Sequence, residues 1–129
     1  MESIIPLSSS VPSSTSLLAQ LTSLIPKQSN KKSSGGDFNA LEIAAVWNKA
    51  LAIPGQDMSL WRQDPCGAYM YRWHYGKTDS LWGWEIDHMY PVARGGTDSL
   101  NNLQALHWKN NRRKGDSTTY SCAITYGGV

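Results

Sequence analysis

A serine-rich segment at the N-terminus limits how much of this chain can fold. Residues 1–36 include eleven Ser and end in Ser-Ser-Gly-Gly, and such a composition cannot bury enough apolar surface to form a core. We therefore expect a disordered leader over residues 1–36 and one folded domain over residues 37–129. Apolar residues at helical spacing within residues 17–25 are the part of the leader that could dock on a protein partner.

Aromatic side chains and an uneven charge distribution characterise the rest of the chain. Six Trp and six Tyr stand against one Phe, and such large rings help a small domain to form a core. Residues 37–129 carry nine basic and nine acidic side chains, so net charge alone does not predict binding to nucleic acid. Four cations nevertheless crowd into six positions and could meet phosphate: Lys109, Arg112, Arg113 and Lys114.

The two cysteines and the hydropathy pattern bear on where the protein works. Cys66 and Cys122 lack a Cys-x-x-Cys spacing, so they signal neither a zinc knuckle nor a redox motif. They could pair or stay free. Because nothing else in the sequence points to an oxidising compartment, we expect free, buried thiols and an intracellular protein. No apolar run approaches the roughly 20 residues that span a bilayer, so we expect a soluble protein without a membrane partner.

Hydrophobic periodicity and turn residues predict an α+β domain. The elements expected, in chain order, are a helix capped by Asp37 that ends at Pro54-Gly55, strands over residues 68–73, 82–89 and 100–103, a helix from Gln104 or Ala105 to Lys114, and a half-buried strand over residues 119–126.

Four polar residues in the second half carry the chemistry. Asp87 and His88 stand side by side near a strand end, Asn102 lies on the return strand and Asn111 on the next helix. Hydrolysis of a phosphodiester needs a base, a hard cation and oxygen ligands for that cation. His88 suits the base and the oxygens of Asp87 and Asn111 suit Mg²⁺. An ideal strand points Asp87 and His88 to opposite faces, so we expect the strand to end or distort there.

The spacing of these residues resembles the HNH endonuclease motif, the ββα-metal nuclease fold. The elements that match lie within residues 82–116: Asp87-His88-x-x-Pro91, Gly95-Gly96, Asn102-Leu103 and Asn111-x-x-Lys114. The resemblance implies a ββα core, and we expect an N-terminal helix and a strand pair before it. The resemblance also implies that His88 is the general base, that Asp87 and Asn111 bind the metal, that Asn102 braces the loop and orients His88, and that Lys114 lies near the scissile phosphate.

Two departures from the common family pattern concern metals. Asn111 stands where a His is more common, which resembles a His-Asn-Asn variant and favours Mg²⁺, or Mn²⁺, over Zn²⁺. Many relatives hold a structural zinc with Cys-x-x-Cys pairs, whereas this chain has His107 and Asn110 at the second pair. We therefore expect no structural zinc.

The resemblance implies an endonuclease that hydrolyses DNA. Backbone phosphates would be met by cations on the loop and the last helix, namely Arg94, Lys109, Arg112 and Arg113. Two alternatives stay open. One is an inactive domain of the same fold that binds nucleic acid or protein, and the other is a nuclease toxin effector whose leader serves delivery.

Overall fold

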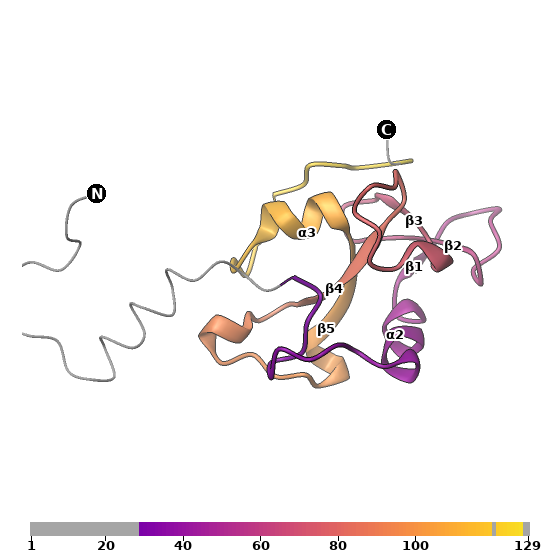
Figure 1. Cartoon of the computed structure of the whole chain (residues 1–129). Helices are drawn as coiled ribbons and strands as arrows, with labels where there is room; N and C mark the ends of the chain where they lie inside the picture. The colour runs from indigo at the N-terminus through magenta and orange to yellow at the C-terminus, as the bar shows by residue number, and fades with distance from the viewer. Residues whose placement is uncertain (1–28, 120, 128–129) are drawn as a thin grey trace, which may run out of the picture.

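A strand hairpin followed by a helix forms the centre of the protein. The computed structural model describes residues 29–119 and 121–127. Within them, β4 (Trp84–His88) pairs antiparallel with β5 (Leu103–His107), in a register that sets Trp84 opposite His107 and His88 opposite Leu103. The helix α3 (Trp108–Lys114) follows β5 directly and packs back on both strands (Figure 1). This ββα unit within an α+β fold confirms the expected fold class.

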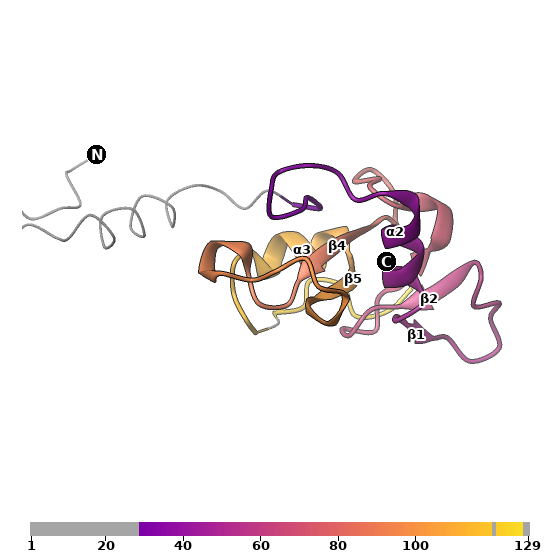
Figure 2. The same ribbon diagram turned by 90° about the horizontal axis from the view of Figure 1, so that it is seen from below.

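A second sheet and a helix precede the hairpin. The sheet has three short antiparallel strands, β1 (Leu51–Ala52), β2 (Trp61–Gln63) and β3 (Tyr69–Tyr71), where two were expected. The helix α2 (Ala40–Trp47) is capped by Asn39 in a reciprocal capping box with Glu42, rather than by Asp37. Figure 2, seen from below, shows α2 and this sheet on the same side of the hairpin.

The apolar core lies where α2 meets the hairpin. Trp84 is fully buried in β4, and its ring lies 5.2 Å from that of Trp47 and 4.9 Å from that of Tyr75, centroid to centroid. Ile86 and Leu103 complete the same cluster. Burial of these rings and aliphatic groups supplies the main favourable free energy for the hairpin.

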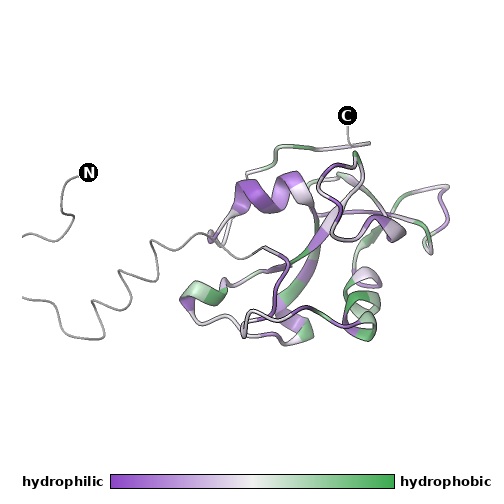
Figure 3. Ribbon diagram, in the orientation of Figure 1, coloured by the Kyte–Doolittle hydropathy of each residue, from purple (hydrophilic) through white to green (hydrophobic). Residues whose placement is uncertain are grey.

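The helix α3 differs in character from α2. Figure 3 colours most of α3 as hydrophilic, whereas α2 includes strongly hydrophobic residues. Three polar residues of α3 are nevertheless buried: Asn110, Asn111 and Lys114. Because buried polar groups must be hydrogen-bonded or paired to be tolerated, α3 contacts the hairpin through a polar network rather than an apolar stripe.

The return strand and the last helix begin later than the sequence predicts. Residues 100–102 form a 3₁₀ turn and the strand runs over Leu103–His107, so the expectation of a helix from Gln104 or Ala105 was wrong. Gln, Ala and Leu are good helix formers, but each residue here pairs with a partner in β4. Strand pairing therefore overrides local helix propensity.

The C-terminal segment is held by a disulfide instead of a strand. Cys66 and Cys122 form a disulfide, so the expectation of free thiols was wrong. No strand is present over residues 117–119 and 121–127, contrary to the prediction for residues 119–126. Figure 1 shows this yellow segment running over α3. The alternation of residue types predicted a strand, but the backbone N–H groups of Ala123 and Ile124 donate to the Asn110 side chain rather than to a neighbouring strand.

An Asp64–Asn110 pair links the two parts of the fold beneath that segment. The Asp64 carboxylate accepts from the backbone N–H groups of Cys66 and Ala68, and from the Asn110 side chain at 2.9 Å. It also accepts from the backbone of His107 at 3.0 Å. Asp64 is fully buried, so these bonds satisfy a charge that would otherwise be costly to bury.

The packing begins further toward the N-terminus than residue 37. The Asn30 side chain accepts from the Ile86 backbone N–H at 2.8 Å and from the Tyr75 hydroxyl at 2.7 Å, along the edge of β4 that does not pair with β5. We call residues 29–36 the N-terminal arm. The apolar island at residues 17–25 lies outside the described residues, and within the described part no helix is long and apolar enough to cross a membrane.

Candidate active site

A buried carboxylate and a buried ammonium face each other between β4 and α3. Asp87 is fully buried, and its Oδ1 lies 3.2 Å from Nζ of Lys114, whose side chain is 2% exposed. The other carboxylate oxygen accepts a hydrogen bond from the Gln104 amide at 2.9 Å. Lys114 also donates to the backbone carbonyl of His88 at 3.1 Å. The Lys114 ammonium thus shows that a cation is accommodated against Asp87.

Glu85 forms a second carboxylate in the same interface. It lies two residues before Asp87 and therefore on the same face of β4. Its Oε1 accepts from the Asn111 amide at 3.0 Å, and Arg112 donates to both of its oxygens, at 3.1 and 3.3 Å. Glu85 was not among the residues predicted from the sequence, although its spacing from Asp87 was a sufficient signal.

The Asp87–Lys114 and Glu85–Asn111 contacts together fix Asn111 beside Asp87. Glu85 and Asp87 are separated by one strand residue, and their partners Asn111 and Lys114 are three residues apart on α3, where side chains share a face. Asn111 is fully buried. Because its Nδ2 donates to Glu85, its carbonyl oxygen is turned to the opposite side of the amide. The structure thus brings the Asp87 carboxylate and the Asn111 amide into one polar cluster.

His88 lies on the other face of the strand. β4 ends at His88, as expected, but it is regular up to that residue, so consecutive side chains point to opposite faces. The ring of His88 lies 6.1 Å from that of Phe38, and its Nε2 lies 2.8 Å from Oδ1 of Asp98. Asp98 was not among the residues predicted from the sequence. The imidazole and Asp87 therefore flank the end of β4 from its two sides.

Asn102 holds the loop that joins the two strands. Its Oδ1 accepts from the Tyr90 backbone N–H at 2.8 Å, and its Nδ2 donates to the carbonyls of Tyr90 and Thr97. Gly95 ends a 3₁₀ turn with a positive φ of 95°, and a Cβ on Gly96 would collide with the Tyr90 carbonyl. These contacts keep the backbone around the end of β4 in one conformation.

The four cations predicted to contact phosphate lie on α3 and on the loop between β4 and β5. Arg112 and Arg113 lie in the last turn of α3, with Arg112 engaged by Glu85 and Arg113 exposed. Lys109 lies near the start of α3, with its Nζ 5.5 Å from the Trp108 ring centroid. Arg94 is exposed on the loop between β4 and β5. The structure therefore does not gather these four cations into one cluster.

The donor set favours a hard divalent ion. Within the described residues no group of three or more His, Cys, Asp or Glu could hold a metal, so thiolate and imidazole cages of that size are absent from this part of the chain. The oxygens of Asp87 and Asn111 are the ligand type that Mg²⁺ takes, with water filling its other positions. In donor chemistry the residues fit Mg²⁺ or Mn²⁺.

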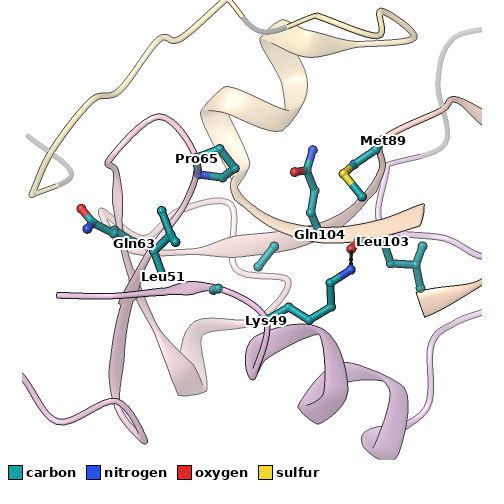
Figure 4. Close-up of a pocket in the computed structure, with 9 residues that line it drawn as sticks. Lys49, Leu51, Gln63, Pro65, Met89, Leu103 and Gln104 are labelled. Atoms are coloured by element: carbon teal, nitrogen blue, oxygen red, sulfur yellow. Dashed lines mark hydrogen bonds between the residues drawn. The ribbon is translucent and has the colours of Figure 1, made fainter. Parts of the chain in front are cut away.

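An apolar pocket adjoins this cluster on the side of the second sheet. Its volume is about 320 Å³, and its walls include Leu51, Pro65, Met89 and Gln104. Figure 4 shows Gln104 rising from β5 toward Met89, with Lys49 below. Lys49 donates to the carbonyls of Leu100 and Leu103, and these bonds tie the end of α2 to the start of β5.

The comparison with protein families matches the segment that contains this geometry. Residues 76–117, about a third of the chain, match the HNH endonuclease family. A search of curated proteins and a search of solved structures found no match. The matched segment includes β4, β5, α3 and the loop between the strands. The ββα unit and the loop between its strands thus lie in a segment that is similar to the HNH endonuclease family.

Proposed function

We propose that this protein is a metal-dependent endonuclease that hydrolyses DNA phosphodiester bonds. One observation carries the proposal. A buried Asp87 carboxylate and the Asn111 amide share a polar cluster at the end of β4, with the next residue, His88, on the opposite face of the strand, inside a segment that matches a nuclease family. The domain proper spans residues 37–129 in this proposal, and the N-terminal arm packs on it.

Asp87 and Asn111 would hold the metal, Mg²⁺ or Mn²⁺, through their oxygens. When bound, such an ion neutralises charge on the phosphate and on the leaving oxygen. Glu85 keeps the Asn111 amide oriented by accepting from its Nδ2. Gln104 holds the second oxygen of Asp87, so the carboxylate has a fixed direction before any substrate arrives.

His88 acts as the general base in this proposal and takes a proton from the attacking water. Asn102 fixes the loop that follows His88, so the imidazole has little freedom to move. Lys114, held by Asp87 and the His88 carbonyl, places its positive charge next to the reacting phosphate. DNA would approach the end of β4, which His88 and Lys114 flank from its two faces.

Contacts to the DNA backbone would come from cations on α3 and on the loop between β4 and β5. Arg94 and Arg113 are exposed and able to reach phosphates, and Lys109 and half-exposed Arg112 extend the positive surface along α3. Phosphate contacts position a duplex without reading its sequence. We therefore expect this domain alone to show little preference for a DNA sequence. A protein partner bound at the leader could supply further sequence specificity.

One observation favours an inactive binding domain instead. The Asp87 carboxylate is paired with Lys114, and such a pair could be purely structural. That alternative predicts salt-dependent DNA binding without cleavage. A toxin effector would cleave DNA and arrest growth when expressed, with growth restored by His88→Ala.

A plasmid-nicking assay tests the proposal. Wild-type protein should relax supercoiled plasmid with Mg²⁺ or Mn²⁺ and should stop when the metal is chelated. Asp87→Ala should abolish cleavage, and Asn111→Ala should raise the metal concentration required. Asp79→Ala and Asn101→Ala, which change exposed residues outside the cluster, are the matched controls. DNA that is bound but left intact under all metals would contradict the proposal.

A further inference from the structure

We propose that Asp98 is a positioning residue for His88: its carboxylate fixes the imidazole in the tautomer with the proton on Nε2, and the N-terminal arm holds that carboxylate in place. The inference rests on the proposed function, in which His88 is the base. It adds a residue and a segment to which neither the family match nor the motif assigns a role.

The hydrogen bond between His88 and Asp98 determines which ring nitrogen carries the proton. Nε2 of His88 lies 2.8 Å from Oδ1 of Asp98. Burial tends to raise the pKa of the Asp98 carboxyl, but the hydrogen bonds from His88 and Ser33 outweigh it, and the pKa lies below its ordinary value. Asp98 is therefore ionised at neutral pH. An ionised carboxylate only accepts hydrogen bonds, so Nε2 carries the proton.

The other ring nitrogen of His88, Nδ1, is the one that can take up a proton. In a neutral imidazole with the proton on Nε2, Nδ1 has the lone pair that can accept a proton. Nδ1 of His88 forms no hydrogen bond with the described residues. Because no buried side-chain nitrogen or oxygen of the described part lacks a partner, Nδ1 reaches solvent. Asp98 thus leaves Nδ1 as the ring nitrogen that can accept a proton from water.

The N-terminal arm holds the Asp98 carboxylate in place. Its two oxygens accept from Ser33, at 2.9 Å from the backbone N–H and 2.7 Å from the hydroxyl. Ser33 lies 65 residues earlier in the chain, and Asn30 anchors the same arm on β4. Three donors therefore converge on one carboxylate, which leaves it little freedom to rotate away from His88.

The ring nitrogens of His88 can be observed directly by ¹⁵N NMR of metal-free protein. The chain has three His, so the His88 signals are identified by their loss in His88→Ala. We expect the Nε2–H tautomer in wild type and in the control Asp79→Ala. Asp98→Asn keeps the size of the side chain but can donate from its amide, so the Nδ1–H tautomer should become populated. Asp98→Ala should give a mixture as well.

Steady-state kinetics provide the second measurement. Losing the partner that orients a histidine typically costs about 10- to 100-fold in activity, and we expect Asp98→Asn to lower kcat by that amount with KM changed less than about twofold, since no substrate contact is lost. Ser33→Ala removes one of two arm donors and should lower kcat by a smaller factor. Ser34→Ala, next to it on the arm, is the matched control.

Two results would overturn the inference: an Nδ1–H tautomer in wild type, or an Asp98→Asn variant that keeps both the wild-type tautomer and the wild-type kcat. If wild type fails to cleave DNA, the proposed function fails. The tautomer measurement still decides in that case whether Asp98 orients His88.

Discussion

At the scale of single residues, the ion pair between Asp87 and Lys114 is the feature on which the site depends most. Both side chains are buried, at 0% and 2% exposure, so each charge needs the other. A divalent ion bound to Asp87 would share that carboxylate with the ammonium. Metal affinity and folding stability should therefore be coupled through Lys114.

Replacing Lys114 tests this coupling. Lys114→Met keeps much of the apolar stem but leaves Asp87 uncompensated, and removal of one partner of a buried pair typically costs about 3–5 kcal/mol. We expect a lower Tm without metal and a larger rise in Tm on adding Mg²⁺ than in wild type. Differential scanning fluorimetry measures both, with the exposed Lys109→Met as control. An equal rise in Tm on adding Mg²⁺ in Lys114→Met and in wild type would contradict the coupling.

Sequence patterns predicted some of these residues and missed others for a physical reason. Asp87 and Asn111 could be predicted to converge because a hairpin followed by a helix brings them together. Glu85 follows from strand alternation alone. Asp98 could not be found this way, since its contact with His88 depends on the course of a loop and on Ser33, 65 residues away.

At the scale of elements, the junction between β5 and α3 decides where the helix begins. His107 ends β5, and its Nδ1 accepts from the Lys109 backbone N–H while Nε2 donates to the Leu81 carbonyl. Its side chain thus caps α3 in the neutral form. The start of α3 could not be predicted from propensity because it depends on this cap and on pairing with β4.

The cap makes stability dependent on pH. Burial lowers the pKa of His107, and the bond to Leu81 offsets this only in part. In the unfolded chain its pKa returns to about 6.5, so the unfolded state binds the proton first. The contribution to stability is present above about pH 6.5 and is lost as the pH falls below that value toward the lowered pKa.

Thermal unfolding between pH 5 and 8 measures this contribution. His107→Asn keeps a side chain that can cap a helix but does not titrate, so Tm should fall less between about pH 7 and pH 5 than it does in wild type. His74→Asn is the control and should keep the wild-type profile. A His107→Asn profile that runs parallel to wild type would show that the cap is not the source.

At the scale of the whole molecule, two long-range connections hold the hairpin and helix in place. The N-terminal arm is hydrogen-bonded to the edge of β4 that does not pair with β5, and the disulfide closes a connection with a sequence separation of 56. The fold class was predictable because the periodicities are local. The disulfide was not, because two cysteines without a motif reveal nothing about their distance in space. Disulfides persist in oxidising surroundings, and the expectation of free thiols rested on the lack of any other sign of such surroundings in the sequence.

Breaking the disulfide should destabilise the protein considerably. A closed loop of this length restricts the unfolded chain by about 4 kcal/mol in the chain-entropy treatment. We expect guanidinium unfolding of the double variant Cys66→Ser/Cys122→Ser to show a loss of about that size, and reduced wild type to behave like the double variant. A midpoint unchanged by reductant would mean that the disulfide does not form in solution.

The central claim is that His88 activates water for cleavage of DNA, and one measurement tests it most directly. The initial rate of plasmid nicking with Mg²⁺ should be compared for wild type, His88→Ala and the control His74→Ala. A general base contributes about 10²- to 10⁴-fold, so His88→Ala should cut slower than wild type by at least about 100-fold, while His74→Ala keeps most of the rate. Cutting by His88→Ala at the wild-type rate would contradict the account.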